Sequence, residues 1–194
     1  MRLRYLCAAV VLSGLTLAGT AQTGSASAAP GSLIAPAQAQ DELLNIFEKD
    51  FMAVAKAMPA EKYGFAPAAA NFAPEQGAKF EGVRTFAQEV SHVSQANYFF
   101  GSAIMGEKPP AEAQAVGKLT TKDELLKAAA DSFAYAHKAI ATITAENAYA
   151  AIKGADGLRT RSEIASFIAA HGFDHYGQMV EYLRMSGIIP PGSK

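Results

Sequence analysis

The stretch TRSEIASFIAAHGFDHYGQMVEYLRMSG, from Thr160 to Gly187, decides the fold. Thr160 and Glu163 have the spacing of a capping box, which satisfies free N–H groups at the start of a helix. Gly187 fits the left-handed position that ends a helix, and two prolines follow. Between these signals, apolar residues recur every three or four positions: Ile164, Phe167, Ile168, Met179, Tyr182 and Leu183. This period predicts one long amphipathic helix.

Three further segments show the same period and predict helices: residues 41–58, 81–105 and 121–150. The last of these opens with a second capping box, Thr121 to Glu124, and its buried face is expected at Leu126, Phe133 and Ile140. No alternating strand pattern appears, so the sequence predicts an all-α four-helix bundle. The Ala-, Pro- and Gly-rich connection over 60–79 is long, and connection lengths favour at least one long crossover.

The first 28 residues have the features of a secretory signal peptide. A basic start is followed by an apolar run over 5–17 and then by small residues. The run is too short for a membrane span, which needs roughly 20 residues. Cleavage is expected after Ala21 or near Ala28, and the sequence does not decide between them. We therefore expect a periplasmic or secreted protein without a stable membrane anchor after cleavage.

Composition describes an ordinary globular protein, with 50% hydrophobic and 18% charged residues. Residues 29–40 predict a flexible tail and residues 41–191 the bundle. Loss of Arg2 and Arg4 with the leader would reduce the 17 basic residues to 15, against 18 acidic ones, a net charge of −3. This mildly acidic chain has no basic run, so no nucleic-acid partner is expected. The single cysteine, Cys7, would leave with the leader, which excludes disulfides and thiolate chemistry.

Histidines are the residues with the clearest chemical potential. His171 and His175 lie four positions apart on the predicted buried face, so they project as neighbours. They are interpreted either as partly exposed or internally bonded side chains, or as ligands of a metal in the bundle core. His92 lies beside the apolar stripe of the 81–105 helix, which includes Val83. His137 is interpreted as a residue at the edge of the bundle.

Three segments together resemble the DinB-like family: KFEGVRTFAQEVSHVSQANYFF (79–100), TTKDELLKAAADSFAYAHKAI (120–140) and HYGQMVEYLRMSGIIPP (175–191), the last preceded by His171. The resemblance spans essentially the whole chain after the leader. It implies a four-helix bundle in which one histidine of the second helix and two of the fourth hold a divalent metal. The matching positions are His92, His171 and His175.

Imidazole ligands suit Zn²⁺, Ni²⁺, Fe²⁺ or Cu²⁺, and three histidines leave a coordination position open, as catalytic zinc sites do. Gln178 is a candidate to orient a substrate or water there, or else a polar residue facing a neighbouring helix. Asp174 and Glu89 are candidates to hold an imidazole N–H, with solvent exposure as the alternative for both. Gly172 would allow a neighbouring helix or a ligand to approach closely.

No reaction follows from these residues. There is no HExxH motif, because Gly172 follows His171, and no GxSxG, P-loop or dinucleotide fingerprint. The first hypothesis is a metal-dependent enzyme acting on an unidentified small molecule, a hydrolase or transferase. Some DinB-like relatives resemble thiol-S-transferases, but a secretory leader counts against a cytosolic thiol cosubstrate. The alternative is a non-catalytic metal-binding or stress-associated bundle, with a homodimer through an outer helix face. A third hypothesis is a structural bundle whose histidines hold no metal.

Overall fold

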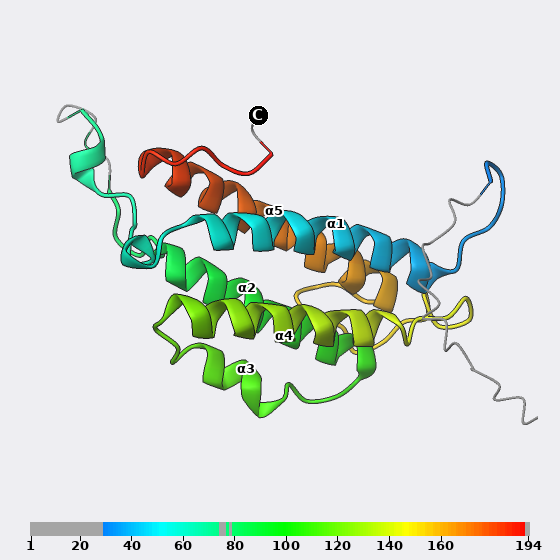
Figure 1. The fold of residues 1–194 in the computed structure, drawn as a ribbon. Helices are drawn as coiled ribbons and strands as arrows, with labels where there is room; N and C mark the ends of the chain where they lie inside the picture. The colour runs from blue at the N-terminus through cyan, green and yellow to red at the C-terminus, as the bar shows by residue number, and fades with distance from the viewer. Residues whose placement is uncertain (1–28, 74–76, 78, 193–194) are drawn as a thin grey trace, which may run out of the picture. The chain divides into compact units, whose positions relative to one another are not determined.

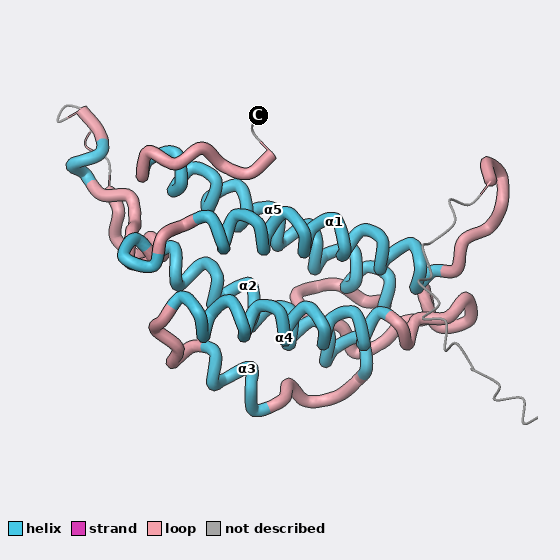
Figure 2. The backbone as a smooth tube through the Cα atoms, viewed as in Figure 1, coloured by secondary structure: helices cyan, strands magenta, loops and turns pink. Residues whose placement is uncertain are grey.

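The computed structural model describes residues 29–73, 77 and 79–192. This part of the chain contains five α-helices and no strands, which confirms the predicted all-α class (Figures 1 and 2). The helices are α1 (Pro36–Ala57), α2 (Phe86–Met105), α3 (Ala111–Val116), α4 (Lys122–Ile140) and α5 (Arg161–Met185). The predicted signal peptide lies outside the described residues. None of the described helices combines the length and hydropathy needed to cross a bilayer.

The four long helices form the bundle, with α1 and α2 each packed between α4 and α5. At one end, the side chain of Gln40 near the start of α1 donates to Ser162 at the start of α5. At the other end, Lys122 at the start of α4 donates to the Lys56 and Met58 carbonyls at the end of α1. Helices α1 and α5 are therefore parallel to each other and antiparallel to α4 (Figure 1).

Helices α2 and α4 are also parallel, although they are consecutive long helices. Asn97 donates to Ser132 over 3.1 Å, and further along both helices the Ser102 and Tyr135 hydroxyls lie 2.8 Å apart. The connection between them must return along the bundle, and it carries the short helix α3 (Figure 1). The expected long crossover is this connection.

The connection from α1 to α2 stays at one end of the bundle. The backbone carbonyls of Tyr63 and Phe65 accept hydrogen bonds from Ala87 and Phe86 at the start of α2. The buried Tyr63 hydroxyl donates to the Ala55 carbonyl in α1 over 2.6 Å. Tyr63 and Phe65 therefore join the end of α1 to the start of α2, whereas residues 68–71 and 81–84 of the connection are exposed.

Two helix starts differ from the prediction. Helix α1 begins at Pro36, so residues 36–40, predicted as part of a flexible tail, are its first turns. Proline is favoured at this position because its ring fixes a helical φ and its missing N–H is not needed there. Helix α2 begins at Phe86 rather than 81, because Thr85 caps it by accepting from the Gln88 N–H. Val83 consequently lies outside the helix and is exposed, not part of the buried stripe.

Helix α4 ends at Ile140, ten residues before the predicted end. The chain turns after it, where the Asn147 side chain accepts from the Thr144 N–H and donates to the Thr142 carbonyl. These local bonds compete with the helical ones. Both predicted capping boxes are present, at the starts of α4 and α5. Leu126 is only half-buried, and Leu125 occupies the core beside Phe133.

The core beneath α5 is aromatic. The ring of Phe47 in α1 contacts those of Phe51 and Phe133, with centroids 5.6 and 5.4 Å away. The same ring lies against Gly172 in α5, where an added Cβ would lie 2.0 Å from the Phe47 Cζ atom. The close approach of a neighbouring helix, one of the two roles predicted for Gly172, is confirmed. Gly172 therefore lets α1 approach the turn of α5 that carries His171.

Candidate metal centre

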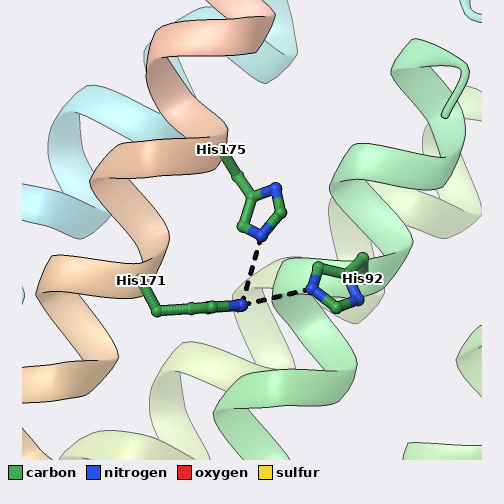
Figure 3. Close-up of side chains that lie close together, drawn as sticks. All are labelled: His92, His171 and His175. Atoms are coloured by element: carbon green, nitrogen blue, oxygen red, sulfur yellow. Dashed lines mark hydrogen bonds between the residues drawn. The ribbon is translucent and has the colours of Figure 1, made fainter. Parts of the chain in front are cut away.

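Two antiparallel helices bring three histidines together. The Tyr182 hydroxyl, near the end of α5, donates to the Arg84 carbonyl just before α2, and Arg161 at the start of α5 donates to the Ile104 carbonyl near the end of α2. This register places His92 of α2 opposite His171 and His175 of α5 (Figure 3). His92 and His171 are 79 residues apart in sequence, yet their Nε2 atoms lie 3.2 Å apart.

The nitrogen geometry fits a single divalent ion. The Nε2 atoms of His171 and His175 lie 3.1 Å apart, and one ring nitrogen of each of the three histidines lies within 4.8 Å of the others (Figure 3). Two imidazole nitrogens at about 2.0–2.1 Å from one ion would lie roughly 3–3.4 Å apart at octahedral or tetrahedral angles. His171 Nε2 faces two other ring nitrogens, His92 Nε2 and His175 Nε2. Because a neutral ring nitrogen is either a donor or an acceptor, it cannot form the same hydrogen bond with both. An ion would accept all three lone pairs.

Glu89 orients one of these imidazoles. Its Oε2 atom lies 2.7 Å from His175 Nδ1, and the residues are 1% and 5% exposed. A carboxylate there accepts the Nδ1–H, which leaves the Nε2 lone pair of His175 directed at the other two histidines. The role predicted for Glu89 is therefore present in the structure, and its burial rules out the alternative of solvent exposure.

Two of the three histidines have lowered pKa values. Burial lowers the pKa of His92 to about 4, helped by the positive charge of Arg84 and by the other two histidines. Burial also lowers the pKa of His171, with His175 as the next cause. At neutral pH these rings are therefore unprotonated and able to donate a lone pair to a metal.

The other polar residues predicted near the site lie further out. Asp174 is exposed, as its alternative interpretation expected, and it accepts a hydrogen bond from the Gln178 amide over 3.3 Å. Its negative charge still acts on the site. It raises the pKa of His171, although burial lowers that pKa by more. Gln178 is half-buried, and its role toward a substrate stays a prediction.

Aromatic rings border the histidines on one side. Phe100 and Phe167 contact the His171 ring, with centroids 5.8 and 5.9 Å away. Phe167 was predicted only as a core residue of its helix, but it is half-buried beside the cluster. Its position one turn before His171 is the signal that places it there.

The fourth histidine has a role that the sequence did not predict. His137 lies at the edge of the bundle, as expected, but both of its ring nitrogens face carboxylates of α1. Nδ1 lies 2.5 Å from Asp41 and Nε2 lies 3.1 Å from Glu48. Asp41 and Glu48 are seven positions apart, two turns on one face of α1, which is the sequence signal that could have suggested a shared partner.

The fold and the site together define a class: helical bundles with a three-histidine centre between two antiparallel helices. A sequence model of the DinB superfamily matches residues 43–179, a range that contains all three histidines and Glu89. The chain therefore belongs to the DinB superfamily. A search of curated proteins gives no match.

Proposed function

We propose that this protein binds a divalent metal, Zn²⁺, Ni²⁺ or Fe²⁺, through His92, His171 and His175, and that it is a metal-dependent enzyme acting on a small molecule as a hydrolase or transferase. The proposal includes export to the periplasm or the medium. The observation that carries it is the convergence of three imidazoles from two helices, with nitrogen separations of 3.1 and 3.2 Å.

The residues present fit such an ion. Neutral ligands leave its double charge uncompensated, and three ligands leave room for a substrate atom. A metal in this position would act as a Lewis acid that polarises a carbonyl or a leaving group. Glu89 fixes the His175 ring so that the Nε2 atom keeps its direction. Gln178, three residues beyond His175, is the candidate to orient a bound molecule.

Partial exposure favours an enzyme over a closed binding module. His175 is buried, whereas His92 and His171 are half-buried. The cluster therefore has one side anchored in the core and another within reach of solvent. A purely structural site gains nothing from this exposure, but a substrate requires it.

Metal analysis of tag-free protein tests the site. We expect about one divalent ion per chain, lost in His92→Ala and in His171→Ala. His137→Ala is the matched control, because it removes a histidine outside the cluster and should keep the metal. Retention of stoichiometric metal in both site variants would show that the ligand assignment is wrong.

The open position is tested separately with Co²⁺ as the spectroscopic metal. Azide, a small exogenous ligand, should change the visible absorption of the Co²⁺-loaded protein, because a coordination position is available. An unchanged spectrum at saturating azide would indicate a closed centre. That result would favour the non-catalytic metal-binding module.

A further inference from the structure

We propose that the molecule that binds at this centre is a small organic anion in which a carboxylate is joined to an aromatic or similarly apolar body. This inference rests on the proposed function and names its substrate class. It is drawn from two residues that flank His92 in the sequence: Arg84, a cation just before α2, and Phe99, an exposed aromatic residue of α2.

Helix α2 arranges these groups in order. Phe99 follows His92 by seven residues, two turns, so both project from the same face about 10 Å apart along the axis. Arg84 precedes His92 by eight residues and lies just outside the N-cap of the helix. The three histidines therefore lie between a positive end and an apolar end.

The apolar end is a continuous series of ring contacts. Phe99 packs on Phe100 with centroids 5.2 Å apart, and Phe100 packs on Phe167 at 5.4 Å. Phe100 and Phe167 both contact the His171 ring. Phe99 keeps 43% of its surface exposed, so the series leads from solvent to the ligand histidine. An apolar group bound here would remove exposed aromatic surface from water.

The positive end is fixed to α5. The Arg84 carbonyl accepts a hydrogen bond from the Tyr182 hydroxyl over 3.1 Å, and Tyr182 lies two turns beyond His175. Arg84 directly precedes Thr85, the N-cap of the helix that carries His92. Arg84 is exposed, and within the described part of the chain it forms no salt bridge.

The charges favour an anion. Three carboxylates act on the histidines: Glu89, buried and bonded to His175, and Asp174 and Asp156, both exposed. Solvent screens the exposed charges, and a divalent ion outweighs the single buried carboxylate. A guanidinium binds a carboxylate through two parallel hydrogen bonds, and a cation with neutral ligands attracts the same group. The carboxylate would therefore lie toward Arg84 and the open metal position, with its apolar body toward Phe167 and Phe99.

The test uses Co²⁺-loaded protein titrated with benzoate, acetate and benzamide, followed by visible absorption. Benzoate should bind at least tenfold more tightly than acetate, because acetate has no ring to contact the aromatic series. Benzamide, which has the ring but no charge, should bind more weakly than benzoate by a similar factor. The readout is binding, so no reaction has to be known.

Variants then test the positive end and the apolar end separately. Arg84→Gln keeps the backbone carbonyl that Tyr182 uses, and it should weaken benzoate and acetate binding at least fivefold without changing Co²⁺ affinity. Phe99→Ala should lower the preference for benzoate over acetate. The controls are Arg184→Gln, which removes an arginine of α5 paired with Glu181, and Ile46→Ala, which truncates an exposed apolar residue of α1. Neither control should change binding.

Two kinds of failure are distinguishable. Absence of Co²⁺ binding by the wild-type protein would remove the metal centre itself and, with it, this inference. Normal Co²⁺ binding with equal affinity for benzoate, acetate and benzamide would overturn the substrate class alone. The same conclusion would follow if Arg84→Gln bound both carboxylates as the wild-type protein does.

Discussion

Glu89 of α2 and His175 of α5 form a buried pair, with the carboxylate 2.7 Å from the imidazole Nδ1 atom. The pair joins the two helices that carry the three histidines. It also fixes which nitrogen of His175 faces the cluster, so the geometry of the centre depends on a residue outside it.

Replacing Glu89 should therefore weaken metal binding without removing a ligand. We expect Glu89→Ala to lower metal affinity by about 10–100-fold, and Glu89→Gln to lower it less, because the amide oxygen still accepts the Nδ1–H. Competition with a chromophoric chelator measures this. Glu181→Ala is the control, since Glu181 is an exposed carboxylate of α5 that pairs with Arg184. Wild-type affinity in Glu89→Ala would contradict the assigned role.

Gly172 should tolerate no side chain while Phe47 is present. Gly172→Ala would place a Cβ 2.0 Å from the Phe47 ring, so we expect a loss of about 1–3 kcal/mol in the free energy of unfolding from overpacking. Gly177→Ala in the same helix meets nothing within 4 Å and should stabilise by up to about 1 kcal/mol. Urea denaturation compares the two. Equal effects at both positions would show that the close packing of α1 on α5 is wrong.

The metal-free protein should lose stability as the pH falls from neutral. Burial lowers the pKa of His92 from 6.5 to about 4. Between these values the unfolded chain binds a proton that the folded protein does not, so the free energy of unfolding decreases with decreasing pH. The depressed pKa of His171 acts in the same direction. The urea midpoint of chelator-treated protein, measured at several pH values, gives the slope of stability against pH over this interval. The His92→Gln variant should show a smaller slope. A midpoint that rises toward acid pH would contradict the account.

His137 should contribute to stability and not to metal binding. Its ring nitrogens face Asp41 and Glu48, so it ties α4 to α1 at the end of the bundle where α1 begins. Because these side chains are partly exposed, we expect His137→Ala to cost about 1 kcal/mol or less. Thermal denaturation tests the effect on stability, and metal analysis of the same sample tests the effect on metal binding. Loss of metal in this variant would place His137 in the site.

The sequence predicts the parts of the fold that depend on local signals. Capping boxes begin α4 and α5 where Thr121 and Thr160 lie. The end of α4 and the starts of α1 and α2 were predicted wrongly, because the apolar period was taken to set them. They are set by the bonds of Asn147 in the turn after Ile140, by Pro36 at the first helical position and by the Thr85 cap. Helix α3 was not predicted, since six residues give too little of a helical period to detect.

The residues of the site also divide into those that a single helix places and those that depend on how the helices pack. The pairing of His171 with His175 follows from one helical turn. The approach of His92 depends on the register between α2 and α5, which no single helix contains, and only the family resemblance pointed to it. Glu89 and Asp174 looked equivalent in the sequence, each close to a histidine of its own helix. The structure separates them, because Glu89 bonds across the interface to His175 while Asp174 faces solvent.

The ligand set itself is measured most directly by X-ray absorption spectroscopy of the zinc-loaded, tag-free protein. The account predicts a first shell that contains three imidazole nitrogens at about 2.0–2.1 Å, and this shell should be absent from His171→Ala, because that variant does not retain the metal. A shell without imidazole scattering, or one unchanged when His171 is removed, would contradict the central claim.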